Sequence, residues 1–567
     1  MNKVFFENRN VQKTLNLPVT GFPMKANLVQ KEPEMLKFWE SSNVFQLMQD
    51  ASGSRGEYRL HDGPPYANGH IHLGHALNKI LKDIIIKSRN LMGWKTGYIP
   101  GWDCHGLPIE HNVEVELGEK KKDLPAHAIR KRCRQYAQKF LDIQRKEFKR
   151  LGVLGDWDHP YMSMDPKYEA VTAGELATFV ERGSLVRSKK PIYWCCHCKT
   201  ALAEAEVEYR DLSSPSIYVR FPLADARLKD VFEAADPSRA YVVIWTTTPW
   251  TLPSNLAIAL NPDFTYVVGR YAKDGAERKF IIVRELIETV SAKTGWTLVE
   301  ELATFKGSEL EKRNARHPFL NRDSLIINAA YVTTDAGTGA VHIAPGHGAD
   351  DYIAGMAYGL PVLSPVDDDG NYTAECGLPH LVGKHVFQSN EDIITLLVEG
   401  NRLLAREEFT HQYPHCWRSK TPIIFRAVKQ FFISMEKLRG QALEQIDKTE
   451  WLPAWGRNRI YSTVEARPDW CISRQRTWGV PLPVFFDEND KPVLSADIVN
   501  KVADLVAEHG TNIWFELTSE QLCEKLGLPT NLKKGKDTLD VWIDSGCSHV
   551  AVLERHPELC APCDVYL

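Results

Sequence analysis

The residues with the clearest chemical pattern are two histidines at the expected start of a helix. Residues 58–63 predict a short strand, residues 63–69 a Pro/Gly/Asn loop, and apolar residues from Leu77 to Ile85 recur at helical spacing. His72 and His75 share one face of the first helical turn, where free backbone N–H groups favour an anion. Gly74 leaves room for a flat base or ribose against the backbone. The pattern predicts a triphosphate site, although such a histidine pair also serves as an ordinary helix cap.

A second pattern is a cysteine pair with the spacing of a zinc knuckle. Cys195 and Cys198 are separated by two residues, but a structural zinc ion needs four ligands. The second half is expected at Cys416, where the residue three positions later is Ser419. Two interpretations stay open: a Zn²⁺ site completed by a nearby residue, or a degenerate ribbon without metal. The residues that could complete a site are Cys196, His197, His411 and His415.

The two cysteine segments are expected to meet in space, which makes residues 199–412 an insertion with adjacent ends. Its strand-like runs and turns predict a β-rich domain. Thr246, Thr247 and Thr248 end one of these strands and Asn255 follows a Pro-rich turn, a pattern that β propensity alone also explains. A glycine-rich segment, GTGAVHIAPGHGADDY, contains His342 and Asp351, and its spacing is neither that of a dinucleotide fingerprint nor that of a Walker loop.

Further candidates flank this insertion. Asp103 follows an expected strand end, where open α/β sheets place ligand contacts and where Asp also caps helices. RPDWCISRQRTWGVPLPVF contains Gln475 and Trp478 in an arginine and aromatic cluster that packing alone could explain. Asp544 follows in DTLDVWIDSGCSH. Two helices are also expected, one over EPEMLKFWE and a long basic one over residues 125–151.

Composition is that of a multidomain globular protein. The 567 residues are 43% hydrophobic and 25% charged, and 69 basic against 73 acidic residues give a net charge of −4. Any nucleic-acid surface must therefore be a local patch. Because the sequence has no charged-then-apolar leader and no run of eighteen apolar residues, we expect a cytoplasmic protein without a membrane segment. Its twelve cysteines are then expected to be reduced thiols or metal ligands.

The string HIHLGH, between GPPYANG and PGWDCHGLPIE, resembles the HIGH signature region of class I aminoacyl-tRNA synthetases, most closely the isoleucyl group. GWDCHGLPIE and ISRQRTWG favour isoleucine over valine. The resemblance implies that His72, Gly74 and His75 assist adenylate formation from ATP and Mg²⁺. It further implies that Asp103 pairs the α-ammonium of isoleucine and that Trp478 packs on its side chain. The substrate and ATP contacts that it implies are Pro65, Tyr66, Asn68, Asp103, Gln475, Trp478 and Asp544.

The two chemical segments of the insertion resemble the editing domain of the isoleucyl, valyl and leucyl synthetases. The resemblance implies that Asp351 holds the α-ammonium of a mischarged amino acid. Thr246, Thr247, Thr248, Asn255 and His342 would shape the pocket and place a water on the ester carbonyl. The expected activity is ATP-dependent charging of tRNA(Ile) with isoleucine and hydrolysis of valyl-tRNA(Ile).

The fold class that we expect is α/β, a Rossmann-like core interrupted by a β-rich editing insertion. The expected parts are an extension (1–57), the first part of the catalytic domain (58–194), the insertion (195–420) and a return to the catalytic domain (421–567). No KMSKS string occurs in the printed sequence, so the chain resembles a fragment that edits without activating, and a monomer is expected. Two alternatives stay open: a stand-alone trans-editing hydrolase or tRNA-binding module with an inactive nucleotide fold, and a HIGH-type nucleotidyltransferase acting on a small molecule.

Overall fold

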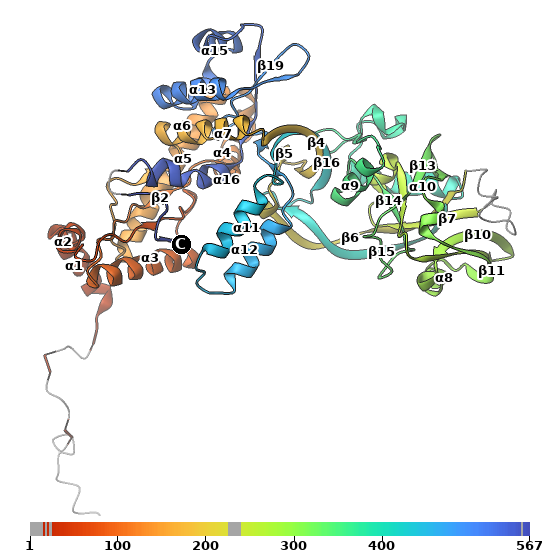
Figure 1. Ribbon diagram of the computed structural model, residues 1–567, viewed down its shortest axis with the longest axis horizontal. Helices are drawn as coiled ribbons and strands as arrows, with labels where there is room; N and C mark the ends of the chain where they lie inside the picture. The colour runs from red at the N-terminus through yellow and green to blue at the C-terminus, as the bar shows by residue number, and fades with distance from the viewer. Residues whose placement is uncertain (1–14, 17–19, 22–24, 225–239, 557–558) are drawn as a thin grey trace, which may run out of the picture. The chain divides into compact units, whose positions relative to one another are not determined.

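The computed structural model describes residues 15–16, 20–21, 25–224, 240–556 and 559–567 (Figure 1). Its chain divides into two compact units, each built from separate stretches of sequence. Unit 1 comprises residues 1–103, 137–162 and 552–567, and unit 2 comprises residues 104–136 and 163–551. Within the described residues, no helix combines the length and apolar character that crossing a bilayer requires.

Unit 1 contains a parallel α/β arrangement around one long helix. Strand β1 (Leu60–His61) pairs in parallel with β23 (Val565–Tyr566), and β2 (Gly101–Trp102) pairs in parallel with β3 (Tyr161–Met162). Parallel bridges also join Glu57 to Lys95 and Tyr66 to Asp103, so β1, helix α3 (Leu73–Leu91) and β2 form a βαβ unit. The other helices are α1 (Leu28–Ser41), α2 (Val44–Ala51) and the C-terminal part of α5 (Ala126–Arg150). Helix α1 confirms the helix predicted over EPEMLKFWE, and α5 confirms the one predicted over residues 125–151.

Helix α3 is present where its periodicity predicts it, but its apolar stripe does not face a core. Leu77 is 62% exposed and Ile84 is 55% exposed. The side chains that α3 buries are those of Lys79, Lys82, Asp83 and Ile86. The spacing therefore predicts the helix correctly, but the face of α3 that packs inside unit 1 carries mainly charged side chains.

The charge that orients α3 is the carboxylate of Asp62, at the end of β1. Asp62 is fully buried and forms ion pairs with Lys79, at 2.5 Å, and with Lys82. It also accepts a 2.8 Å hydrogen bond from the backbone N–H of Gly101, the first residue of β2. Burial lowers the pKa of Lys79 to about 8, although Asp62 opposes the shift. One carboxylate thus joins β1, α3 and β2.

Unit 2 contains a helical part and a β-rich insertion. Its helices are α4 (Leu107–Leu117), α6 (Pro166–Gly174), α7 (Leu176–Glu181), α11 (Arg439–Lys448), α12 (Gly456–Glu465), α13 (Ala496–His509), α14 (Asn512–Glu516), α15 (Ser519–Leu526) and α16 (Val541–Gly546). A four-stranded sheet, ordered β17-β16-β4-β5, links the two parts through β4 (Leu185–Cys195), β5 (Thr200–Ala201), β16 (Ile424–Ile433) and β17 (Trp470–Cys471). Three short strand pairs complete this part: β18 (Ser473–Arg474) with β22 (Thr538–Leu539), and β19 (Phe485–Phe486) with β20 (Pro492–Val493) and β21 (Lys533–Lys534).

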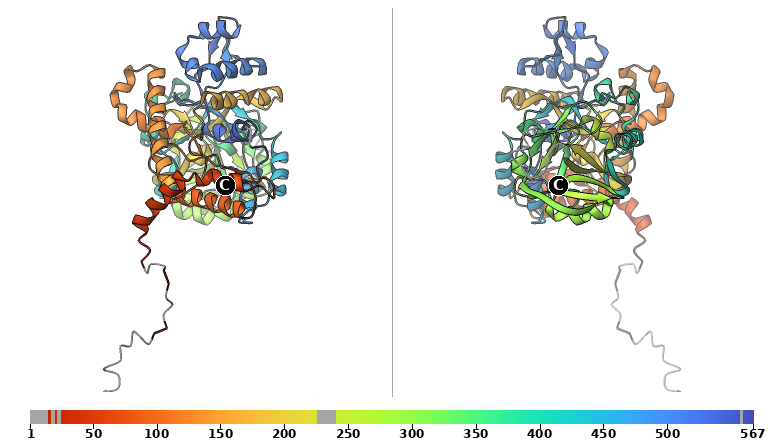
Figure 2. Two further views of the ribbon diagram at one scale, coloured as in Figure 1. Left: turned by 90° about the vertical axis from the view of Figure 1, so that its left-hand side faces the viewer. Right: turned by 90° about the vertical axis from the view of Figure 1, so that its right-hand side faces the viewer.

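The insertion is β-rich, as its sequence predicts. One sheet has the order β11-β9-β10-β7-β6-β15, and the strands of it that Figure 1 labels lie together there; Figure 2 draws the same ribbon from two further sides. Their bounds are β6 (Val207–Pro222), β7 (Ala240–Thr246), β9 (Thr265–Lys273), β10 (Ala276–Val283), β11 (Thr297–Lys306) and β15 (Leu403–Cys416). The second sheet, ordered β12-β13-β8-β14, contains β8 (Ala257–Leu260), β12 (Asn314–Arg316), β13 (Asp323–Asn328) and β14 (Ala340–Ile343). Helices α8 (Ile287–Thr294), α9 (Ala349–Ala357) and α10 (Asn390–Glu399) accompany the sheets.

Strands β6 and β15, near the two ends of the insertion, form one long ladder. β6 and β15 are antiparallel, and their register runs from Val207 opposite Cys416 to Val219 opposite Leu403. Beyond this ladder, the backbone N–H of Leu223 donates to the carbonyl of Ala240 at 3.0 Å, and residues 225–239 lie outside the described part of the chain. The predicted adjacency of the two ends of the insertion is confirmed.

We expect Asp62→Ala to destabilise unit 1 by about 3–5 kcal/mol, because it leaves two buried ammonium groups without a counter-charge. Urea unfolding followed by tryptophan fluorescence measures this loss. Asp50→Ala, at an exposed position of α2, is the matched control and should leave the unfolding midpoint unchanged. An Asp62→Ala midpoint equal to that of the control would remove Asp62 from its proposed structural role.

Candidate functional site

The two histidines of the nucleotide-site prediction cap α3 and stack on each other. His72 Nδ1 accepts hydrogen bonds from the backbone N–H groups of Gly74, at 3.0 Å, and His75, at 3.4 Å. His75 Nδ1 in turn accepts from the backbone N–H of His72. The ring centroids are 3.7 Å apart. Both Nδ1 atoms are acceptors, so both Nε2 atoms carry hydrogen and remain available as donors to an anion. The cap and the anion site are therefore compatible.

Gly74 leaves room for the ring of His72, because it has no side chain. A Cβ atom at Gly74 would lie 2.9 Å from Cε1 and 3.0 Å from Nδ1 of His72, closer than such contacts allow. Burial lowers the pKa of His75, and the nearby His72 and Lys79 lower it further. The lowered pKa keeps His75 neutral, with its one ring hydrogen on Nε2, where it can be donated to a ligand.

The loop before α3 is fixed to the end of β2. The backbone N–H of Asp103 donates to the carbonyl of Pro65, and that of Ala67 donates to the carbonyl of Asp103, both at 2.9 Å. Gln144 Nε2 donates to the carbonyls of Tyr66 and Gly69, also at 2.9 Å. Asn68 lies in the same turn, since its N–H donates to the carbonyl of Tyr66. The structure thus brings together four predicted contacts in unit 1: Pro65, Tyr66, Asn68 and Asp103.

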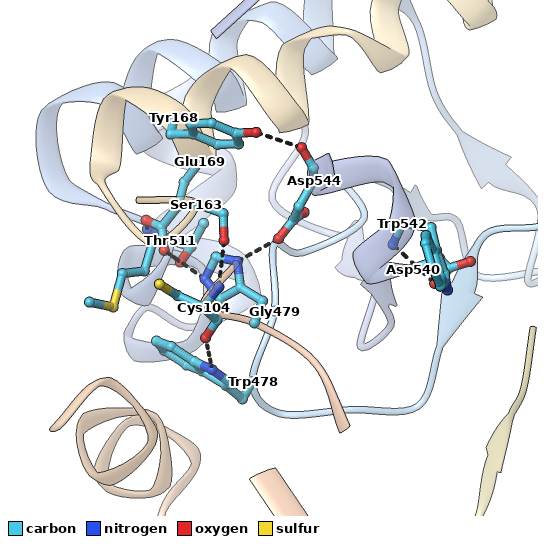
Figure 3. Close-up of polar contacts among 12 residues, drawn as sticks. Cys104, Ser163, Tyr168, Glu169, Trp478, Gly479, Thr511, Asp540, Trp542 and Asp544 are labelled. Atoms are coloured by element: carbon cyan, nitrogen blue, oxygen red, sulfur yellow. Dashed lines mark hydrogen bonds and ion pairs between the residues drawn. The ribbon is translucent and has the colours of Figure 1, made fainter. Parts of the chain in front are cut away.

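In unit 2, Trp478 and Asp544, both labelled in Figure 3, contact His105, a buried histidine that the sequence did not single out. His105 Nδ1 is 2.6 Å from Asp544 Oδ2, and its Nε2 is 3.3 Å from Glu169 Oε1. The centroids of the His105 and Trp478 rings are 4.8 Å apart. Burial disfavours the charged imidazole, but the two carboxylates outweigh it and raise the pKa of His105 to about 9. His105 is therefore a buried cation at neutral pH.

Trp478 and Gln475 are held by protein groups. Trp478 is 1% exposed, and its Nε1 donates a 2.7 Å hydrogen bond to the carbonyl of Cys104 (Figure 3). A small cavity of about 20 Å³ adjoins Trp478 and Gly106. The side-chain amide of Gln475 donates to Gln430 and Asp537, and it accepts from the backbone N–H of Ala201. Gln475 therefore joins segments of unit 2, and its role as a substrate contact stays a prediction.

Four of the six predicted editing residues, Thr246, Thr248, Asn255 and His342, belong to one polar network in the insertion, which Thr251 connects. Asn255 Nδ2 donates to His342 Nδ1 at 2.9 Å, and His342 Nε2 is 2.7 Å from Thr251 Oγ1. Thr251 Oγ1 donates to the carbonyl of Thr248 at 2.8 Å and lies 3.3 Å from Thr248 Oγ1. Thr246 Oγ1 accepts from the backbone N–H of Thr248 at 3.1 Å. The network joins the segment at and after the end of β7 to β14, and the roles that the resemblance implies for these residues stay predictions.

Burial sets the protonation of two groups at this network. It lowers the pKa of His342 to about 3, so the imidazole is neutral. Both ring nitrogens of His342 are occupied by protein partners, which leaves it a structural role. Asp351 Oδ2 accepts a 2.8 Å hydrogen bond from the N–H of Ala344, two residues beyond His342. Burial raises the pKa of Asp351 to about 7. An ammonium group placed here would restore the charged form of the carboxylate.

The cysteine cluster contains three thiols. The Sγ atoms of Cys195, Cys198 and Cys416 all lie within 4.8 Å of one another. Ser419 takes the fourth place, with its Oγ 3.5 Å from Cys195 Sγ and 2.7 Å from Thr421 Oγ1. The predicted meeting of the two segments is confirmed. Of the other residues considered, His415 bonds through Nδ1 to the carbonyl of Tyr413.

Comparisons with known proteins agree with the sequence motifs. A family model described as tRNA synthetases class I (I, L, M and V) matches residues 34–566. The chain belongs to this family of class I tRNA synthetases. An isoleucine–tRNA ligase of Desulfovibrio desulfuricans is 56% identical over 98% of this synthetase chain and 60% of that protein. Proteins of the same name from Nitratidesulfovibrio vulgaris, strain Miyazaki F, and Moorella thermoacetica are 55% and 49% identical over 98% of this chain and 60% and 59% of their own lengths.

The synthetase chain therefore spans about 60% of the length of these curated relatives. The family match agrees with the α/β class and with the β-rich insertion seen in the fold.

Three residues that the structure places in contact with predicted site residues could not be found, or were not selected, from the sequence. Thr251 lies three residues after Thr248 in WTTTPWT, so its type and spacing could have indicated it. His105 follows Asp103 in GWDCHGLP, where a charged residue beside an expected strand end is also a visible signal. Ser324, which donates a 2.5 Å hydrogen bond to Asn255 Oδ1, gives no signal, because a single serine in a predicted strand is ordinary.

We expect Asp351→Asn to raise the melting temperature at pH 8 and to leave it unchanged at pH 4. The pKa of Asp351 is raised in the folded state, so wild-type stability falls as pH rises from the unfolded-state pKa, about 4, through about 7. Asparagine can still accept from Ala344 but has no charge to bury. Differential scanning fluorimetry at both pH values measures the effect, with Asp350→Asn, at the exposed neighbouring position, as control. A lower melting temperature for Asp351→Asn at pH 8 would contradict the assignment.

Proposed function

We propose that this chain is part of an isoleucine–tRNA ligase that activates isoleucine with ATP, transfers it to tRNA(Ile) and hydrolyses valyl-tRNA(Ile). The name of relatives 49–56% identical over 98% of the chain supports the substrate. The observation that carries the hydrolytic part is the placement of Asp351, bound to the backbone two residues beyond His342 at the threonine network. A charge-pairing group and a polar wall are what a mischarged amino acid requires.

For activation, His72 and His75 offer Nε2–H donors at the N-terminus of α3, where the α-phosphate develops negative charge during displacement. Asp103 would bind the α-ammonium of isoleucine, and Pro65, joined to it through a backbone hydrogen bond, would line the same pocket. Mg²⁺ would enter with the nucleotide. Phosphate oxygens and water commonly supply most of the ligands of such an ion, together with one or two carboxylates.

For editing, the need is set by the small difference between the two amino acids. One missing methylene is worth only about 1–3 kcal/mol in synthetases of this kind, which is too little to exclude valine at a single pocket. Asp351 would pair the α-ammonium of the esterified valine. The half-buried Thr247 and Thr248 would limit pocket size and orient the attacking water. His342 would hold the wall in place, because both its nitrogens are already bonded.

We expect Asp351→Ala to reduce kcat/KM for valyl-tRNA(Ile) deacylation by about 30-fold or more, because a buried ammonium loses its counter-charge. Release of labelled valine from valyl-tRNA(Ile) measures the rate. Asp350→Ala, which changes the exposed neighbour, is the control. Deacylation by Asp351→Ala at the wild-type rate would remove Asp351 from the mechanism.

The cysteine cluster supports a second proposal, a structural Zn²⁺ held by Cys195, Cys198 and Cys416. Three thiols fit three of the four positions of a tetrahedral zinc site. The fourth position belongs to the hydroxyl of Ser419, a poor zinc ligand that already bonds to Thr421. Zinc would stabilise the knuckle where β4 and β15 end.

We expect Ser419→Cys to bind Zn²⁺ more tightly than the wild-type chain, because it supplies the fourth thiolate. Competition with a chromogenic chelator measures the affinity, and metal content after purification gives an independent readout. Cys198→Ser is the matched opposite change and should weaken retention. Equal affinity for wild type and Ser419→Cys would contradict a zinc site at this cluster.

A further inference from the structure

The polar network of the insertion extends one residue beyond the residues that shape the proposed editing pocket. Ser324, on β13, is fully buried, and its hydroxyl is 2.5 Å from Asn255 Oδ1. Asn255, also fully buried, donates from Nδ2 to the carbonyl of Ala257 at 2.8 Å and to His342 Nδ1. A backbone carbonyl can only accept, so the amide nitrogen of Asn255 must face Ala257 and His342. The oxygen must then face Ser324.

This orientation fixes the direction of every later bond. Since Asn255 donates to His342 Nδ1, the hydrogen of the neutral imidazole is on Nε2, which donates to Thr251 Oγ1. Thr251 has then only its own hydroxyl hydrogen left, and this goes to the carbonyl of Thr248. Each residue from Ser324 to Thr251 therefore donates to the next one, and the last bond ends at the carbonyl of Thr248.

We propose that Ser324 is a positioning residue of the editing site, which acts through Asn255 and His342 to hold Thr248 in place. This inference rests on the proposed editing function. Without the Ser324 hydroxyl, the oxygen of Asn255 is a buried acceptor without a partner. The amide of Asn255 is then held by Ala257 but no longer on its oxygen side, so its bond to His342 Nδ1 weakens and the hydrogen of His342 is less strictly confined to Nε2. Thr251 can donate to the imidazole in place of Thr248, whose carbonyl is released.

The charges near this chain of bonds favour the same neutral state. The pKa of His342 is lowered by burial first and then by the neighbouring His347 and Arg322. A protonated His342 would also turn an N–H toward the N–H of Asn255. Position, and not acid–base exchange, is therefore what Ser324 supplies.

The test compares Ser324→Ala with a matched variant, Ser254→Ala. Ser254 is also a fully buried serine of the insertion, and its hydroxyl has no hydrogen-bond partner in the described part of the chain. Two quantities are measured on the 567-residue chain. One is kcat and KM for valyl-tRNA(Ile) deacylation, and the other is the pair of ¹⁵N shifts of His342, assigned by their loss in His342→Gln.

We expect Ser324→Ala to lower kcat by about tenfold with KM within about twofold, since one buried acceptor loses its partner. The ¹⁵N shifts of His342 should move toward a mixture of the two neutral tautomers. Ser254→Ala should change neither quantity. Unchanged tautomer shifts in Ser324→Ala, or an equal loss of kcat in both variants, would overturn the proposal. If the wild-type chain does not deacylate valyl-tRNA(Ile) but the shifts still move, the editing function fails and the positioning role of Ser324 stands.

Discussion

The antiparallel pairing of β6 with β15 is the constraint on which the organisation of unit 2 depends. This ladder joins residues about two hundred positions apart and holds both ends of the insertion at one place. At that place the chain also brings Cys195 and Cys198 to Cys416. Every candidate editing residue lies between the two strands in sequence. The insertion can therefore build its own site from its own residues, whatever chemistry the remaining parts of unit 2 and unit 1 perform.

Burial without charge pairing distinguishes the proposed editing site from the other polar centres. His105 is held as a cation between two carboxylates, and Asp62 is held as an anion between two lysines. Burial keeps His342 neutral and raises the pKa of Asp351, so the carboxylate of Asp351 has no cationic partner of its own. A substrate ammonium would form an ion pair with Asp351. Such a site gains affinity from a substrate that brings its own cation.

The sequence predicts the elements better than their buried faces. The periodicity of α3 identifies the helix, but Leu77 and Ile84 are exposed because Asp62 draws Lys79 and Lys82 inward, and a pattern based on hydrophobicity cannot foresee a buried ion pair. The threonines, Asn255 and His342 could be predicted from motifs. The role of Ser324 and the pairing of His105 with Asp544 and Glu169 could not, because residues distant in sequence meet only after folding.

The most direct test of the account compares the hydrolysis of valyl-tRNA(Ile) and isoleucyl-tRNA(Ile) by the unmodified 567-residue chain. A pocket sized by Thr247 and Thr248 should hydrolyse the valyl ester at least about tenfold faster, since one methylene that fits or clashes is worth about 1–3 kcal/mol. Equal rates for the two esters, or no hydrolysis of either, would contradict a complete editing site within the insertion.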